Sequence, residues 1–304
     1  MQFSHFKDQL HGIWAFPVTP FDDQLAVDTD ALRATLAFLL EARPAGLVAA
    51  GGSGEHFSLD LDEYRTVVQN VVRAAQGALP VIAGVGGGYG AGREQARVAR
   101  EAGADGLMAL PPSYPRAVDD GLVAYYATLA EASGLPLVVY TRDWAAYGPD
   151  LVARLAELPA VVGLKEGQGD LRAFARLRAR VGDRLAWLGG VGDDLAIGYA
   201  AAGAAGFTSS IFNFAPSIVH ELWAAATSGD LPRARALSER WIVPVYAMRA
   251  RRAGYEVSVT KAAMRLVGLP AGRVRPPLVE ILPSEVDELE QLLIGLPRAS
   301  VAVA

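Results

Sequence analysis

One lysine of this chain is placed where it could act as a nucleophile. The 28 basic residues include three lysines, Lys7, Lys165 and Lys261. Lys165 ends the apolar run 161–164, which predicts a buried strand with an amine at its carboxyl end. Lysine is rarely buried without a partner, and an amine in an apolar site binds its proton less tightly, so it can form a Schiff base with a carbonyl. A lysine paired with a carboxylate such as Glu166 is the equally acceptable alternative.

A tyrosine occupies the matching position of the preceding apolar run. Tyr140 ends the run 136–140, and adjacent strands of a barrel would bring its phenol beside Lys165. A phenol next to a neutral amine can relay protons during imine formation and afterwards. The alternative is an ordinary tyrosine with a satisfied hydroxyl, and the neighbouring lysine favours the relay.

Two further features at strand ends are suited to carboxylates. The glycine-rich loop 51–54 brings backbone N–H groups close to a ligand, and the Ser53 hydroxyl adds a donor. Arg142 offers a planar, permanently charged fork. Each feature has an equally good alternative: the loop could be a tight strand-to-helix turn, and Arg142 could pair with Asp143 or another acid.

The elements that would position these residues recur along the chain. Continuously apolar runs alternate with segments of helical spacing, a pattern that indicates parallel strands covered on both faces. The runs are 12–16, 46–50, 81–84, 106–110, 136–140, 161–164, 185–188 and 206–209. They predict an α/β protein with a closed (β/α)8 TIM barrel, whose active site lies at the carboxyl ends of the strands. An open doubly wound sheet is the alternative.

Beyond residue 212 the pattern is helical only. We expect helices over 215–228, 231–251, 256–267 and 284–293. The prediction is therefore a barrel with the catalytic site over residues 1–228 and a small helical C-terminal extension over 229–304.

Composition narrows the classes of function. The chain is 52% hydrophobic and 20% charged, with a net charge of −5. It has no basic block, signal pattern or apolar run near 18 residues, so we expect a cytoplasmic protein that binds neither nucleic acid nor membrane. The absence of cysteine excludes disulfides, thiolate catalysis and zinc–thiolate sites.

We interpret the cluster of Arg249, Arg251 and Arg252 as a solvated helix face or an interface. The histidines are scattered, and the glycine-rich stretch 86–91 lacks the acidic partner of a dinucleotide site.

These residues in combination resemble the dihydrodipicolinate synthase and N-acetylneuraminate lyase family. The loop 51–55, Tyr140 and Lys165 carry the likeness, together with the segments 16–21 and 102–106. The family implies a class I Schiff-base lyase on a (β/α)8 barrel, with Lys165 as the Schiff-base lysine and Tyr140 as the proton relay. It also implies a small 2-keto acid as substrate, no metal or organic cofactor, and a homo-oligomer, either a dimer or a tetramer.

Within the family the chain is most similar to the 5-dehydro-4-deoxyglucarate dehydratases. The stretches concerned are 50–59, 163–170, 209–214 and 251–258. This implies dehydration and decarboxylation of 5-dehydro-4-deoxy-D-glucarate to 2,5-dioxopentanoate, carbon dioxide and water. Gly52 stands where the synthases have a relay threonine, which agrees with the dehydratases. The resemblance implies that Gly52 and Ser53 hold the carboxylate beside the ketone. It also implies that Ser210, Asn213 and Arg142 meet the hydroxyls and the distal carboxylate.

Three positions depart from the dehydratases: Ser53 replaces threonine, His56 replaces phenylalanine and Thr141 replaces asparagine. An aldolase or synthase of the same family is the alternative, acting on pyruvate or another 2-keto acid like dihydrodipicolinate synthase or a 2-keto-3-deoxy sugar acid aldolase. A non-catalytic keto-acid-binding protein is the alternative from a different class. Tyr114 would reach the site of a neighbouring subunit, as a tyrosine does in the synthases.

Overall fold

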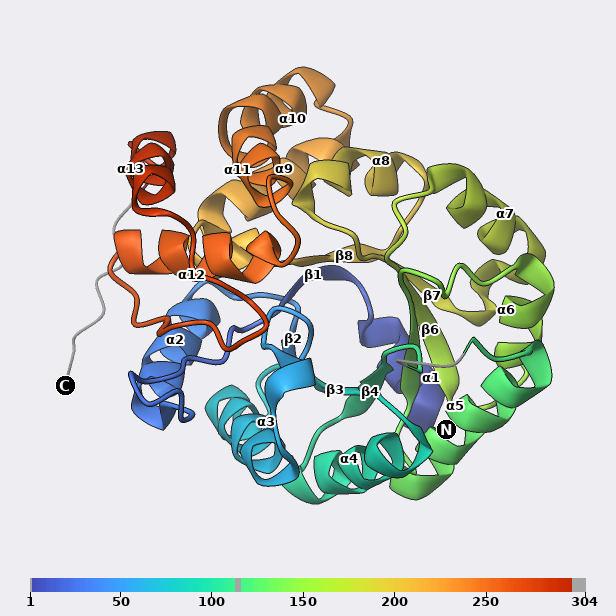
Figure 1. Cartoon of the computed structure of the whole chain (residues 1–304). Helices are drawn as coiled ribbons and strands as arrows, with labels where there is room; N and C mark the ends of the chain where they lie inside the picture. Colours follow the sequence, from blue (N-terminus) through green and yellow to red (C-terminus); the bar gives the residue numbers. More distant parts are fainter. Residues whose placement is uncertain (1, 113–115, 297–304) are drawn as a thin grey trace.

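The computed structural model of the chain describes residues 2–112 and 116–296. Within them, eight parallel strands close into a barrel in the order β1 to β8, surrounded by helices (Figure 1). The strands are β1 Gly12–Ala15, β2 Gly46–Ala49, β3 Val81–Val85, β4 Gly106–Ala109, β5 Leu137–Thr141, β6 Val161–Glu166, β7 Ala186–Gly189 and β8 Gly206–Ser209. This confirms the predicted (β/α)8 barrel, and each strand lies within two residues of its predicted bounds.

The outer helices lie against the strands, and three of them begin at an aspartate cap. They are α2 Thr29–Glu41, α3 Leu61–Ala75, α4 Tyr89–Ala102, α5 Asp119–Ser133, α6 Pro149–Leu155, α7 Leu171–Val181, α8 Ala196–Ala201 and α9 Pro216–Ser228. The side chains of Asp28, Asp60 and Asp170 accept hydrogen bonds from the first free N–H groups of α2, α3 and α7. These caps fix where the loops of the barrel mouth end.

A short helix closes the barrel at the amino ends of the strands. Helix α1 (Gln2–Gln9) lies inside the ring of strands in Figure 1, and Phe6 and Leu10 belong to the hydrophobic cluster of the barrel interior. A Cβ at Gly106 would lie 2.7 Å from the Phe6 ring, and one at Gly163 would lie 3.0 Å from Leu10 Cδ1. Glycines on β4 and β6 therefore make room for α1, which fills this end of the barrel.

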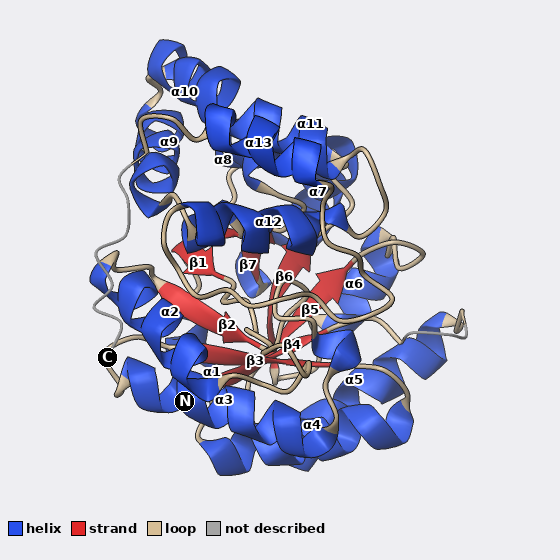
Figure 2. Cartoon of the chain, turned by 60° about the vertical axis from the view of Figure 1, so that its left-hand side comes forward, coloured by secondary structure: helices blue, strands red, loops and turns tan. Residues whose placement is uncertain are grey.

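The helices after α9 form the C-terminal extension, with α12 lying nearest the sheet in Figure 2. They are α10 Leu231–Leu237, α11 Val243–Arg249, α12 Tyr255–Leu266 and α13 Pro283–Leu292. The helix predicted over 231–251 runs without a break from 231 to 249, and a π-helical turn at Ser238–Ile242 lies within it, between α10 and α11. Pro244 follows this turn and cannot donate a backbone hydrogen bond, which accounts for the irregularity. The domain boundary at residues 228 and 229 stays a prediction. In the described part of the chain, no helix is long and apolar enough to cross a membrane.

Candidate active site

Lys165 lies at the carboxyl end of β6 with its amine inside the barrel mouth. The residue is 2% exposed. Its Nζ donates to the carbonyl oxygen of Gly190 at 2.9 Å and lies 3.4 Å from the centroid of the Tyr140 ring and 5.2 Å from that of Phe16. Burial lowers the pKa of Lys165, and the neighbouring Tyr140 only partly opposes this. The neutral amine that attacks a carbonyl is thus more populated than in an ordinary lysine.

The alternative partner, Glu166, is engaged elsewhere. Its carboxylate accepts hydrogen bonds from the Tyr199 hydroxyl at 2.6 Å and from the backbone N–H groups of Gln168 and Gly169 at 2.6 and 3.1 Å. Glu166 forms no ion pair with Lys165 among the residues that the structure describes. The lysine is therefore held by a neutral carbonyl and an aromatic face.

Tyr140 is the direct neighbour of Lys165 across the β5–β6 pair. The Arg142 Nη1 donates to the Tyr140 hydroxyl at 3.2 Å. Burial by itself would raise the pKa of Tyr140, but the positive charges of Lys165 and Arg142 outweigh it, so that the pKa is lowered. A phenol whose proton leaves more easily beside an amine is suited to proton transfer.

Arg142 forms the pairing with Asp143 that was the alternative to carboxylate binding. Besides Tyr140, it contacts Asp143 with 3.6 Å between Nε and Oδ1, and its side chain is 45% exposed. The phenolate form of Tyr140 raises the pKa of Arg142, and the acids Asp143 and Glu256 add to that. The Arg142 guanidinium is thus already surrounded by groups that carry or can carry negative charge.

Two glycines allow Lys165 and Tyr140 to pack so closely. A Cβ at Gly190 would lie 2.5 Å from Lys165 Cγ and 2.6 Å from the Glu166 carbonyl oxygen. A Cβ at Gly167 would collide with the Tyr140 ring. Both positions follow strands of the barrel mouth and have no room for a side chain.

The glycine-rich loop after β2 is held in an unusual conformation. Ala50 and Glu55, which flank it, both have left-handed backbone, with φ of 48° and 53°. Gly52 is exposed and Ser53 half-buried, and a Cβ at Gly52 would meet nothing within 4 Å. The loop therefore borders open space with its backbone, and non-glycine residues in this conformation concentrate at ligand-binding sites.

A buried ion pair from the C-terminal extension secures this loop. Lys261, on α12, and Glu55 are both 0% exposed, with 2.6 Å between Nζ and Oε1. Lys261 also donates to the Arg273 carbonyl, and the other carboxylate oxygen of Glu55 accepts from the Arg275 N–H at 3.0 Å. Sequence inspection missed this pair, although the neighbours 259–263 are mostly apolar and could have indicated a buried lysine.

Ser210 and Asn213 lie where β8 leaves the barrel. Ser210 is half-buried, and its Oγ accepts a hydrogen bond from Arg249 Nη1 at 3.0 Å. Asn213 is fully buried, and its Nδ2 donates to the carbonyl oxygens of Phe16 and Ser210 at 2.8 and 2.9 Å. Asn213 thus braces the junction between β8 and the segment after β1.

The interpretation of the arginine cluster is wrong for Arg249. Arg249 is 4% exposed, whereas Arg251 and Arg252 are exposed. Helix α11 ends at Arg249, and this residue points inward to Ser210 and to Thr260 Oγ1, 2.8 Å from Nη2. The cluster is therefore divided between the interior and the surface.

A second buried carboxylate, which sequence inspection also missed, adjoins Ser210. Asp193 accepts hydrogen bonds from Ser209 Oγ and from the Tyr246 hydroxyl, the latter at 3.1 Å. Burial raises the pKa of Asp193, and the hydrogen bond from Ser209 and the charge of Arg249 oppose it. This network ties β8 to α11.

Two of the positions that differ from the dehydratases have structural partners here. Thr141 Oγ1 donates to the Lys165 carbonyl at 3.3 Å, and His56 Nε2 lies 3.1 Å from Gln95 Oε1. Tyr114 lies outside the described residues.

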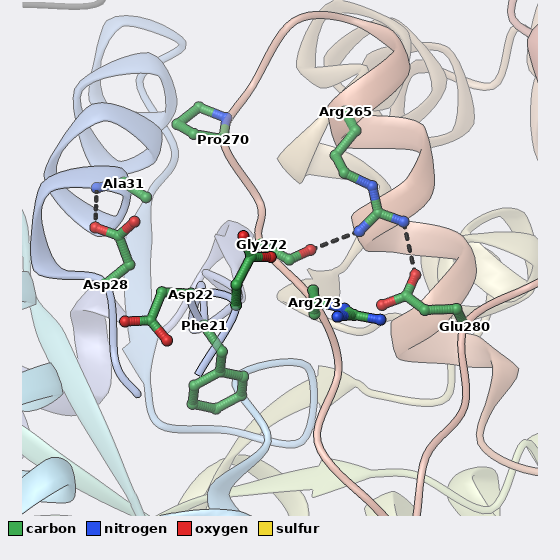
Figure 3. A pocket seen from close by; sticks show the side chains of 10 residues that line it. Phe21, Asp22, Asp28, Ala31, Arg265, Pro270, Gly272, Arg273 and Glu280 are labelled. Atoms are coloured by element: carbon green, nitrogen blue, oxygen red, sulfur yellow. Dashed lines mark hydrogen bonds and ion pairs between the residues drawn. The ribbon is translucent and has the colours of Figure 1, made fainter. Parts of the chain in front are cut away.

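A separate cavity of about 590 Å³ lies between the 21–28 segment and the extension (Figure 3). Its lining contains none of the predicted site residues. Several of its charged groups are already paired: Arg265 bonds Glu280 at 2.7 Å and the Gly272 carbonyl at 2.5 Å, and Asp28 caps α2. In the described part of the chain, no group of three or more His, Cys, Asp or Glu residues could hold a metal ion.

The sequence model of the Dihydrodipicolinate synthetase family matches residues 9–295. The chain belongs to this family. A crystal structure of dihydrodipicolinate synthase from Oceanobacillus iheyensis is 29% identical, with a TM-score of 0.91, 96% of this chain and 98% of that chain being covered.

Curated members of the dihydrodipicolinate synthetase family are more similar in sequence. A protein of Bradyrhizobium sp. is 39% identical over 296 residues, 96% of this chain and 95% of its own. One of Saccharopolyspora erythraea is 40% identical over 294 residues, again 96% and 95%. Both bear the name probable 5-dehydro-4-deoxyglucarate dehydratase.

Proposed function

We propose that the protein is a Schiff-base hydro-lyase that dehydrates and decarboxylates 5-dehydro-4-deoxy-D-glucarate to 2,5-dioxopentanoate, carbon dioxide and water. The observation that carries the proposal is the buried Lys165 amine, with its lowered pKa, beside Tyr140 in a chain of this family. The relatives' names supply the substrate.

The reaction begins at the ketone of the substrate. The neutral Lys165 amine attacks the C5 carbonyl carbon, and Tyr140 carries protons as water leaves and the imine forms. Arg142 donates to the Tyr140 hydroxyl and stabilises its phenolate during this exchange. The protonated imine then withdraws electrons from the neighbouring carbons.

Two bonds break while the imine serves as electron sink. Loss of a C4 proton gives an enamine, whose electrons expel hydroxide from C3 and leave an unsaturated imine. The C1–C2 bond then breaks, carbon dioxide departs, and its electron pair moves through the conjugated system to the nitrogen. Protonation at C4, tautomerisation of the C2 enol to the aldehyde and hydrolysis of the imine release 2,5-dioxopentanoate. The water lost on imine formation is returned in hydrolysis, so one water is released in total.

The barrel mouth offers partners for both ends of the substrate. Backbone N–H groups at Gly52 and Ser53, with the Ser53 hydroxyl, would bind the carboxylate next to the ketone, since the loop borders open space there. Ser210 would contact the distal part of the substrate. Asn213 would support Ser210 from behind, because Asn213 is fully buried and its Nδ2 is bonded to the carbonyl oxygens of Phe16 and Ser210.

The proposal is tested by incubating the protein with 5-dehydro-4-deoxyglucarate and sodium borohydride, mapping the adduct by mass spectrometry and following carbon dioxide in parallel. We expect a reduced adduct on Lys165 and release of carbon dioxide. Lys165→Ala should give neither. Lys7→Arg is the matched control, because Lys7 lies on α1 at the other end of the barrel and should leave both results unchanged.

The other outcomes assign different functions. Release of pyruvate without carbon dioxide would place the protein among the aldolases of the family. Absence of an adduct with any 2-keto acid would refute the Schiff-base mechanism and favour a binding protein.

We also propose that the protein is a cytoplasmic homo-oligomer, either a dimer or a tetramer. Sedimentation analysis tests this assembly, and a monomer at micromolar concentration would contradict it.

A further inference from the structure

A buried cation stands behind the distal side of the barrel mouth. Arg249 is 4% exposed, and in residues 2–112 and 116–296 it forms no ion pair with a carboxylate. Its Nε is buried without a hydrogen-bond partner. Asp193 lies nearby but is engaged by Ser209 and Tyr246. The charge of Arg249 acts on Asp193 from beyond salt-bridge distance, so its guanidinium remains available to polarise a hydroxyl that it contacts directly.

The hydrogen bond between Arg249 and Ser210 has a definite direction. A guanidinium can only donate, so Ser210 Oγ accepts from Nη1 at 3.0 Å. The hydroxyl proton of Ser210 must then point away from Arg249, and it is available to another acceptor. A half-buried serine with a positive charge behind it is a hydrogen-bond donor suited to a carboxylate.

The barrel topology places Ser210 at the same end of the barrel as Lys165. Lys165 Nζ bonds the carbonyl of Gly190, which follows β7, and β7 pairs with β8, which Ser210 follows. Both groups therefore belong to the ends of adjacent strands, where a substrate bound to Lys165 can extend toward Ser210.

We propose that Arg249 is a positioning residue for substrate choice: it orients and polarises the Ser210 hydroxyl, which binds the distal carboxylate of a six-carbon dicarboxylic 2-keto acid. This inference deepens the proposed function and rests on it for the identity of the substrate. Arg142 is less suited to the task, because Tyr140 and Asp143 already engage it.

The indirect contact has a chemical advantage in a decarboxylating enzyme. The distal carboxylate of 5-dehydro-4-deoxyglucarate is the group that departs as carbon dioxide. A bidentate ion pair to it would stabilise the charged ground state more than the transition state, in which that charge disperses. A hydroxyl donor that is polarised by a buried charge still selects the dicarboxylate, but it binds the carboxylate less tightly than a bidentate ion pair would.

The test compares imine formation with two keto acids of equal length. 2-Oxoadipate has the second carboxylate four bonds from its ketone, and 2-oxohexanoate lacks it. The rate of borohydride trapping on Lys165 is measured as a function of keto-acid concentration for both. We expect the unmodified protein to be trapped faster with 2-oxoadipate than with 2-oxohexanoate. In Arg249→Gln this ratio of rates should fall by about 10- to 100-fold, while the rate with 2-oxohexanoate is unchanged.

Further variants separate positioning from a general structural role. Ser210→Ala should lose the preference, and Ser210→Ala/Arg249→Gln should lose no more than Ser210→Ala alone, because Arg249 acts through Ser210. Arg249→Lys should restore part of it. Arg251→Gln is the matched control, since Arg251 is an exposed arginine paired with Glu288 and should leave the preference intact.

Three outcomes would overturn the inference: an equal loss with both keto acids, an additive loss in the double variant, or loss of the preference in Arg142→Gln but not in Arg249→Gln. These outcomes are independent of turnover. If the unmodified protein prefers 2-oxoadipate but does not release carbon dioxide from 5-dehydro-4-deoxyglucarate, the proposed function fails and the inference stands for another dicarboxylic keto acid.

Discussion

Replacing Lys261 by methionine removes one half of the buried ion pair with Glu55 and keeps most of the volume of the lysine stem. Both side chains are 0% exposed, so the carboxylate of Glu55 would stay buried with the Arg275 N–H as its remaining hydrogen bond. The Arg273 carbonyl would also lose its donor. Breaking a buried pair from one side costs about 3–5 kcal/mol. We expect a loss of this size in the free energy of unfolding.

The assay is urea denaturation together with thermal unfolding of the full chain. A loss of this size corresponds to a fall in Tm on the order of 10 °C. Glu55→Gln/Lys261→Met should recover about 2 kcal/mol or more relative to Lys261→Met, because no unpaired charge is left inside. Arg97→Met is the control, since Arg97 and Glu101 form an exposed pair on α4 and should leave the midpoint unchanged.

A loss below about 1 kcal/mol in Lys261→Met would refute the reasoning, because this is the contribution of an exposed pair. A double variant less stable than the single one would refute it as well, since the residual charge of Glu55 would then not be the cause.

Three other changes have defined outcomes. Tyr140→Phe should lower kcat by about 100- to 10,000-fold by removing the proton relay, measured as carbon dioxide release; unchanged turnover would contradict the relay. Gly190→Ala should slow borohydride trapping of pyruvate by about 100-fold, because the new Cβ displaces the Lys165 side chain. An unaltered rate would mean that the backbone at residue 190 shifts to accommodate the methyl group and that Lys165 keeps its place. Burial lowers the pKa of Lys165 from its ordinary value of 10.5, so the rate of borohydride trapping should rise with pH and reach its plateau below pH 10.5. A rate that still rises through pH 10.5 would indicate an ordinary amine.

The barrel and its central pair were predictable because their causes are local. Buried parallel strands are continuously apolar, so the runs around 161–166 and 137–141 stand out in the sequence. A lysine and a tyrosine at the ends of two such runs must meet once the strands are adjacent, as the register of Tyr140 with Lys165 shows.

Other parts depend on contacts between distant segments, for which the sequence has no local pattern. Helix α1 has eight residues and is polar at His5, Lys7 and Asp8, so its stability comes from the barrel around Phe6. Arg249 cannot be told from Arg251 by composition, since the end of α11 decides which of them points inward. Glu55 and Lys261 are 206 residues apart, so a helix of the C-terminal extension carries the group that pairs with the loop after β2.

That separation has a consequence during synthesis. A ribosome adds about 5–20 residues per second, so Glu55 would wait on the order of 10–40 s for Lys261. The segment around Glu55 would have its carboxylate uncompensated until the last helices emerge. A chain interrupted before residue 261 would thus carry the complete set of strands but would lack the lysine that pairs with Glu55 beside the loop 51–54. Premature termination would leave that carboxylate without its counter-ion, so the barrel of a truncated chain should be less stable than that of the full chain.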